Sequence, residues 1–145
     1  MSDEDIIKRA LSIIGNRLQK GPMFSLPQDV KHFLCLAMQG LEHEVFSVMF
    51  LDSQHRMLAY EDMFRGTITR TSVYPREVLK RALALNSSAV VLAHNHPSGV
   101  CEPSRADEYL TQALKTALAL IDVRVIDHIV VSGNLSVSMA ERGLL

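Results

Sequence analysis

The sequence feature that most constrains the fold is a short, unbroken apolar run that ends in two closely spaced histidines. Residues 89–93 read AVVLA, and His94 and His96 follow with Asn95 between them. An apolar run of this length without alternation is typical of a strand buried on both faces, in the middle of a sheet. Because residues i and i+2 of a strand point to the same face, we expect the two imidazoles to converge beyond the strand end, with Asn95 facing away.

The segment after the histidines turns the chain into a helix. Residues 97–99 read PSG; the proline cannot donate a further hydrogen bond to a neighbouring strand, and the serine and glycine turn the chain. Ser104 then begins a helical pattern with Asp107 in its first turn. Two imidazoles and one carboxylate make a three-ligand set of the kind that leaves a catalytic zinc an open position. The spacing therefore indicates a metal site formed by His94, His96 and Asp107.

The same residues also permit a purely structural interpretation. A His-x-His at a surface commonly has no function, and Ser104 and Asp107 fit a capping box, in which the two residues exchange hydrogen bonds at a helix start. On this interpretation Asp107 caps the helix and binds no metal. It does not explain why two imidazoles lie at the end of a buried strand, ahead of a proline and a tight turn.

The spacing of apolar residues predicts a sheet covered by helices. Helices are predicted over residues 3–19, from Ser25 to before Gly40, over 75–86 and from Ser104 to about Ile121; strands are predicted over residues 44–52, 57–64, 67–71, 89–94, 123–132 and 135–138. Helices between strands predict a mixed α/β fold, with a central mixed β-sheet flanked by helices. We expect an N-terminal helical segment over residues 1–39, with 20–26 as a candidate joint, and a main domain over 40–145.

Composition and charge exclude several classes of protein. The chain has 145 residues, 48% of them hydrophobic and 21% charged, with a formal net charge of −1, which gives no general electrostatic case for nucleic acid or membrane surfaces. Two cysteines are too few for a disulfide framework. The acidic start MSDEDIIKRA is unlike a signal peptide, and no apolar run approaches the ~20 residues of a membrane span. We expect a soluble, cytoplasmic protein without membrane contact.

Two metal-dependent families share some of these letters but do not fit. In HNH nucleases the motif residues are dispersed over a ββα-metal unit and are not contiguous. A zinc deaminase needs H-x-E followed by P-C-x-x-C, whereas residue 96 is a histidine and Cys101 has no cysteine partner at that spacing. Three interpretations of Cys101 stay open: a fourth, inhibitory zinc ligand, a redox-sensitive thiol or, most simply, a loop cysteine without a role.

The complete pattern resembles that of the JAMM/MPN (JAB) metalloproteases. H-x-H-P, six residues, S, two residues and D run without a gap from His94 to Asp107. The sequence resembles in particular the RadC-like branch, through HNHPSG at 94–99, PREV at 75–78, DHIVV at 127–131 and ERGLL at 141–145. The resemblance covers roughly residues 40–145 and implies an MPN/JAB-type fold there. The chain looks like a short form that lacks the full N-terminal helix-hairpin-helix region of RadC proteins.

The resemblance implies a role for each predicted ligand. His94 and His96 would bind zinc (Zn2+) as neutral imidazoles, with Asp107 as the third ligand and water as the fourth. Zinc lowers the pKa of a bound water from ~15.7 towards ~7, which makes hydroxide available at neutral pH. This implies hydrolysis of a peptide or isopeptide bond in a peptide or protein substrate that the sequence does not identify.

The resemblance also implies a general base and a hydrogen-bond donor that stabilises the developing negative charge. In this family the base is a glutamate on an earlier strand, and the matching position is Glu44, with Glu42 as a competitor because residues i and i+2 face the same way. Ser104 would hydrogen-bond the developing oxyanion or the metal-bound water. Its single hydroxyl hydrogen cannot serve two acceptors, so we expect capping and catalysis to be compatible only in part.

Two other functions and one further residue are left open. RadC proteins carry a DNA-repair label, so the alternative is a DNA-associated accessory protein with a structural or absent metal. The lack of any Lys/Arg cluster larger than the pair Lys80-Arg81 argues against this alternative. A member of the same fold without metal is a third possibility. His128 lies in an apolar strand, where we predict a core histidine and weigh a contact behind a metal ligand as the less favoured interpretation. No residue pattern indicates an oligomeric state.

Overall fold

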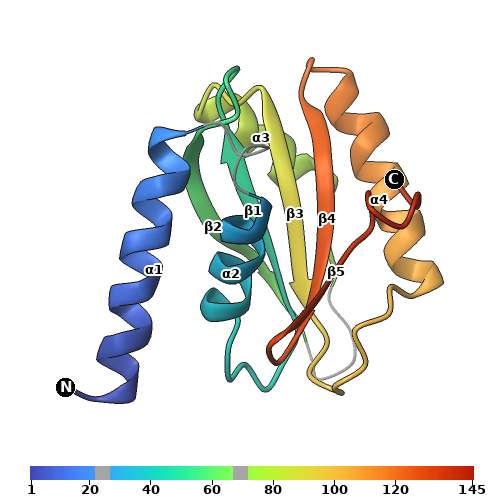
Figure 1. The fold of residues 1–145 in the computed structure, drawn as a ribbon. Helices are drawn as coiled ribbons and strands as arrows, with labels where there is room; N and C mark the ends of the chain where they lie inside the picture. The colour runs from blue at the N-terminus through green and yellow to red at the C-terminus, as the bar shows by residue number, and fades with distance from the viewer. Residues whose placement is uncertain (22–26, 67–71) are drawn as a thin grey trace.

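The computed structural model describes residues 1–21, 27–66 and 72–145, which form a five-stranded mixed sheet with helices on both faces (Figure 1). The elements follow the order α1 (Asp3–Lys20), α2 (Pro27–Ala37), β1 (Val45–Leu51), β2 (Met57–Arg65), α3 (Pro75–Ala84), β3 (Ala89–Asn95), α4 (Arg105–Ala119), β4 (Arg124–Ser132) and β5 (Leu135–Ser138). The predicted α/β fold is confirmed. The strand predicted at 67–71 and the cap predicted at Ser25 lie outside the described residues.

The strand that carries the histidines lies at the centre of the sheet. The strand order is β2-β1-β3-β4-β5, in which β3 pairs antiparallel with β1 and parallel with β4. All seven residues of β3 are buried. A strand covered on both faces needs apolar side chains on both, which explains the unbroken AVVLA run and confirms the prediction made from it.

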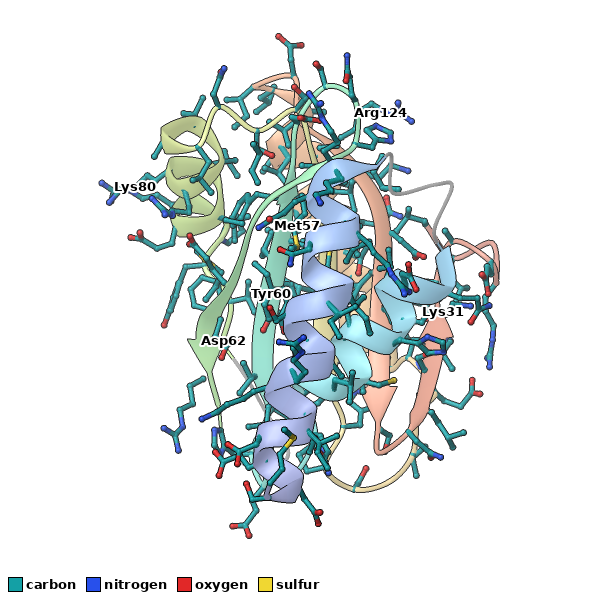
Figure 2. All side chains as sticks on the ribbon, turned by 60° about the vertical axis from the view of Figure 1, so that its left-hand side comes forward. Lys31, Met57, Tyr60, Asp62, Lys80 and Arg124 are labelled. Atoms are coloured by element: carbon teal, nitrogen blue, oxygen red, sulfur yellow. The ribbon has the colours of Figure 1, made fainter. Side chains whose placement is uncertain are left out.

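Two hydrophobic clusters fill the space between the sheet and its helices. On one face, Val91 and Ala93 of β3 pack with α1 and α2, and Leu18 of α1 is completely buried in this cluster. Figure 2 shows Met57 and Tyr60 of β2 beside α1 on this side of the sheet. On the other face, Leu92 packs with residues of α3 and α4. The alternation along β3 therefore places His94 on the α4 side and Asn95 on the α2 side.

Turn and cap signals set several of the element ends. Gly133 adopts a φ of 62°, a left-handed conformation that a side chain disfavours, in the turn that joins β4 to β5. Ser2 and Asp5 form a capping box at the start of α1, and Ser104 and Asp107 form another at the start of α4. Within the described ranges, each helix is too short or too polar to cross a membrane.

Candidate metal centre

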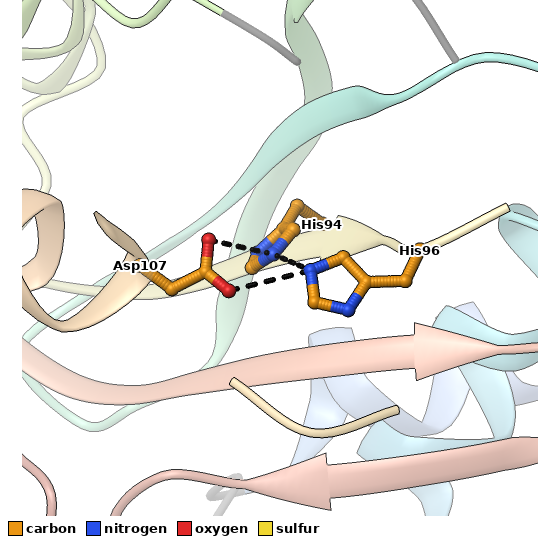
Figure 3. A group of neighbouring side chains, drawn as sticks. All are labelled: His94, His96 and Asp107. Carbon is orange, nitrogen blue, oxygen red and sulfur yellow. Dashed lines mark hydrogen bonds and ion pairs between the residues drawn. The ribbon is translucent and has the colours of Figure 1, made fainter. Parts of the chain in front are cut away.

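The structure brings the three predicted metal ligands together at the carboxyl end of β3 (Figure 3). Nε2 of His94 lies 3.2 Å from Oδ1 of Asp107, and Nε2 of His96 lies 3.3 Å from Oδ2. The two imidazole Nε2 atoms are 2.9 Å apart. Among the residues that the structure describes, only these three form such a group, with their ligand atoms all within 4.8 Å of one another.

Asp107 reaches the imidazoles from the first turn of α4 while it caps that helix. The backbone N–H of Ser104 donates to Oδ2 of Asp107 at 2.7 Å, and the backbone N–H of Asp107 donates to Oγ of Ser104 at 3.1 Å. Capping and contact with the imidazoles are therefore not alternatives, because one carboxylate makes both. Oγ of Ser104 acts as an acceptor in the cap, so its hydroxyl hydrogen is not used there, and the expected conflict between capping and a second role does not arise.

His96 is held by hydrogen bonds at its backbone and at its ring. Its backbone N–H donates to the carbonyl of Val131 at 2.8 Å, and Nδ1 lies 2.8 Å from the carbonyl of Val100. A carbonyl can only accept, so Nδ1 of His96 carries a hydrogen. A neutral His96 therefore turns the lone pair of Nε2 towards Asp107 and His94.

The electrostatics of the group reflect the contact of one carboxylate with two imidazoles. Burial alone would raise the pKa of Asp107, but the imidazoles of His94 and His96 beside its carboxylate outweigh burial, since either ring stabilises the anion when it is protonated, and they hold the pKa of this carboxyl well below its usual range. The hydrogen bond to Asp107 raises the pKa of His96, against the effect of burial. A cation is favourable at the centre of such a group, and two imidazole nitrogens with a carboxylate oxygen are a donor set that suits zinc. The residues present fit a metal ion.

Glu44 lies next to this group and Glu42 does not. Glu44 immediately precedes β1 and is half-buried, whereas Glu42 is exposed. With His94 and Asp107, Glu44 lines a small cavity of about 30 Å³, together with Phe46, Val73 and Leu110. Its charge also makes a smaller contribution to the raised pKa of His96, after that of Asp107. The structure thus favours Glu44 over Glu42 as the carboxylate next to the candidate metal site.

Asn95 has a role that we did not predict. Its side chain is buried, and its Oδ1 accepts a hydrogen bond from the backbone N–H of Val45 at 2.7 Å, while Nδ2 donates to the carbonyl of His43 at 3.0 Å. These two backbone groups flank Glu44 on either side. The sequence indicated that Asn95 would need polar partners, because a buried amide must be hydrogen-bonded, but it did not show which groups they were.

His128 and Cys101 were both left open by the sequence. His128 is buried as predicted for a core histidine, and its Nε2 also lies 2.7 Å from Nδ1 of His94, so it contacts the back of a candidate ligand. Burial, with a smaller contribution from the charge of His94, lowers the pKa of His128 to about 3. The thiol of Cys101 donates to the carbonyl of Val130 at 3.2 Å, and burial raises its pKa. Cys101 is not in the described group of ligand atoms.

The fold and the site together define the class of the protein. A helix-flanked mixed sheet with a His-x-His at the end of its central strand and an aspartate from the following helix is a JAB/MPN-type arrangement. The chain belongs to the family of the RadC-like JAB domain, which matches residues 24–144.

Similar proteins extend over nearly the whole chain. A UPF0758 protein of Leptothrix cholodnii is 64% identical over 140 residues, which cover 97% of this chain and 63% of that relative. A UPF0758 protein of Methylibium petroleiphilum is 62% identical over 141 residues, which cover 97% of this chain and 62% of the relative. The chain therefore spans less than two thirds of the length of these relatives.

Proposed function

We propose that the protein is a zinc-dependent hydrolase that cleaves a peptide or isopeptide bond. The observation that carries the proposal is the meeting of His94, His96 and Asp107 beside a cavity that Glu44 also lines. Zinc in this group would supply a water molecule acidified enough to react at neutral pH. The residues of the chain would hold the ion, orient the water and move its proton.

Glu44 is the proposed general base. The cavity that it shares with His94 and Asp107 measures about 30 Å³, which is enough for one water molecule but not for a larger group. A carboxylate here would accept the proton of the attacking water and return it to the leaving amine, because the same group can act in both directions. Ser104, with its hydroxyl hydrogen unused by the cap, would donate to the developing oxyanion.

A second, larger cavity supports a polymeric substrate. It has a volume of about 350 Å³ and is lined on one side by His96 and Pro97 and elsewhere by residues of the α2–β1 connection and the end of β4. Its lining combines apolar side chains and glycine backbone with the polar side chains of Asn95 and Ser132, so it offers both apolar contacts and hydrogen-bonding groups to a bound segment. The proposed substrate is therefore a peptide or protein whose cleaved bond lies at the metal and whose neighbouring residues lie beside His96.

Metal analysis of the purified protein tests the site. The parent chain is expected to hold one zinc per molecule, and His94→Ala and Asp107→Ala are expected to lose it. His32→Ala, a change of an exposed histidine on α2, is the matched control and should retain the metal. Zinc retained in both ligand variants would contradict the proposal. Binding to duplex DNA at physiological salt, without hydrolysis of any peptide, would instead favour the DNA-associated alternative.

A further inference from the structure

A buried chain of hydrogen bonds runs from the back of His94 to the backbone of Asp107. Nδ1 of His94 lies 2.7 Å from Nε2 of His128, and Nδ1 of His128 lies 2.6 Å from Oγ1 of Thr111. Oγ1 of Thr111 also lies 2.7 Å from the backbone carbonyl of Asp107. Thr111 and His128 are both 0% exposed. The chain therefore begins on one candidate ligand and ends on another, without contact with solvent at either intermediate residue.

The hydrogens of this chain can be placed by counting donors. The hydroxyl of Thr111 has one hydrogen, and the Asp107 carbonyl can only accept, so the hydroxyl donates to it. The other acceptor near this hydroxyl, Sδ of Met139, is farther away at 3.8 Å. The hydroxyl oxygen must then accept from His128, so Nδ1 of His128 carries a hydrogen.

The same count fixes the tautomer of His94. A neutral His128 with its hydrogen on Nδ1 has a lone pair on Nε2, and that lone pair can only accept from Nδ1–H of His94. Nε2 of His94 is thereby left with its lone pair directed at Asp107 and His96. This is the form of imidazole that binds a metal through Nε2.

Packing holds the rings of this chain in place. In the parallel register of β3 and β4, His128 pairs with Leu92, so its side chain lies on the same face as His94 and diagonally beside it. Phe46 stacks on the ring of His94, with centroids 6.3 Å apart, and meets the ring of His128 edge-on at 5.6 Å. The backbone N–H of His128 donates to Oδ1 of Asp127 at 2.7 Å. The orientation of His128 is therefore determined from several sides.

We propose that Thr111 and His128 are positioning residues, which fix the tautomer and ring orientation of His94 so that its Nε2 faces the metal. The inference rests on the proposed metal site. The second ring nitrogen of a ligand histidine usually donates to a carboxylate, a carbonyl or water, and here an uncharged imidazole takes that place. Because Thr111 also holds the backbone of Asp107, one buried network orients ligands from both β3 and α4.

Isosteric changes at Thr111 test the inference. Thr111→Val keeps the shape of the side chain and removes the hydroxyl, whereas Thr111→Ser keeps the hydroxyl. Thr116→Val, on the exposed face of α4, is the matched control. Loss of an outer partner typically weakens metal affinity by about 10–100-fold. We expect a loss of that size for Thr111→Val, and zinc affinity within about threefold of the parent for Thr111→Ser and Thr116→Val, a spread well below that loss.

Two measurements on the folded variants separate positioning from a general loss of structure. Competition with a chromophoric chelator gives the zinc dissociation constant, and long-range ¹H–¹⁵N spectra of the metal-free protein give the tautomer of His94. In the parent we expect the hydrogen on Nδ1, and in Thr111→Val a mixture of both tautomers. His128→Gln, whose amide can accept from His94 and donate to Thr111, should keep the parent tautomer, whereas His128→Leu should lose it.

The outcomes distinguish this inference from the proposal on which it rests. Zinc bound equally tightly by the parent and Thr111→Val, with an unchanged His94 tautomer, would overturn the positioning role. A parent chain that binds no zinc would overturn the metal site. In that case, a His94 tautomer that still changed in Thr111→Val would support the hydrogen-bond chain. A tautomer that did not change would overturn the positioning role together with the metal site.

Discussion

Ser104 and Asp107 exchange hydrogen bonds at the start of α4, and the carboxylate that takes part in this cap lies 3.2 Å from Nε2 of His94. The helix start thereby sets the position of the third candidate ligand relative to the strand that carries the other two. A side chain held at its backbone and at one carboxylate oxygen has little freedom left to lose when it binds a metal. The capping box thus contributes to the site as well as to the helix.

Substitutions at Asp107 should separate its two contributions. Asp107→Asn keeps an oxygen that can accept from Ser104 but loses the charge, so we expect weak zinc binding with the metal-free stability largely retained. Asp107→Ala should lose both the charge and the acceptor for the backbone N–H of Ser104, at a further cost of about 0.5–1.5 kcal/mol for that hydrogen bond, while Oγ of Ser104 still accepts from the backbone N–H of residue 107. Urea denaturation in the presence of a chelator gives the stabilities, and chelator competition gives the affinities. Normal zinc affinity in Asp107→Asn would show that the charge of Asp107 is not needed for binding.

The raised pKa of His96 predicts how zinc binding depends on pH. The hydrogen bond to Asp107 raises this pKa above the ordinary value of 6.5, so metal-free His96 stays protonated to higher pH and zinc must displace that proton. Affinity should therefore fall as pH decreases through the raised pKa, with the fall beginning above pH 6.5 and approaching about tenfold per unit. Isothermal titration at several pH values measures both the affinity and the proton released. Affinity that stays constant down to pH 6 would contradict this prediction.

The same shift has the opposite consequence for the stability of the metal-free protein. A pKa raised by folding contributes stability that is present below the unfolded pKa and is lost as pH rises through the folded pKa. Metal-free protein should therefore gain stability from His96 towards mildly acid pH. In Asp107→Asn this gain should disappear, because the main cause of the raised pKa has been removed. The pH dependence of the urea midpoint in the two proteins makes the comparison.

Glu44→Gln should remove hydrolysis and leave the metal in place. The amide has the shape of the carboxylate but cannot take a proton, and a positioned general base typically contributes about 10²–10⁴-fold to the rate. Glu42→Gln, at an exposed position two residues earlier, is the matched control and should leave the rate unchanged. The rate of cleavage of peptides that the parent cleaves, measured with the zinc content of the same samples, shows which of the two glutamates is the base. A larger loss in Glu42→Gln would assign the base to Glu42 instead.

The sequence could predict the residues of the site that are ordered by local geometry. His94 and His96 share a face because they are two apart in a strand, and Asp107 follows Ser104 at the spacing of a capping box. These relationships span a few residues and are independent of how the sheet is assembled. The apolar run of β3 is also a local signal, because a strand with apolar side chains on both faces must be covered on both. It was therefore enough to predict a place in the middle of the sheet.

The contacts that support the site could not be predicted in this way. Asn95 bonds to Val45, 50 residues earlier, because β1 and β3 are neighbours, and His128 reaches His94 because β4 lies on the other side. The period of a strand says which face a side chain occupies but not which strand lies beside it. Asn95 could therefore be predicted only to face away from the metal, and His128 only to be buried.

Asn95 provides a last prediction, because it supports Glu44 without touching the metal ligands. Its amide bonds to backbone groups on both sides of Glu44, and its side chain lies on the opposite face of β3 from His94. Asn95→Ala leaves the buried N–H of Val45 and the partly buried carbonyl of His43 without this partner, and an unsatisfied buried group such as the N–H costs about 1–3 kcal/mol. We expect a measurable loss of stability and a displaced Glu44.

The two ligand-bearing segments keep their own hydrogen bonds in this variant, so zinc affinity should change little while peptide hydrolysis falls. Asn16→Ala, on the exposed surface of α1, is the control for loss of an asparagine and should leave both properties unchanged. Measurements at a temperature well below the midpoint of thermal unfolding exclude simple loss of folded protein. If hydrolysis and zinc affinity fall together, Asn95 maintains the end of β3 as a whole; if hydrolysis falls alone, its contribution is the placement of Glu44.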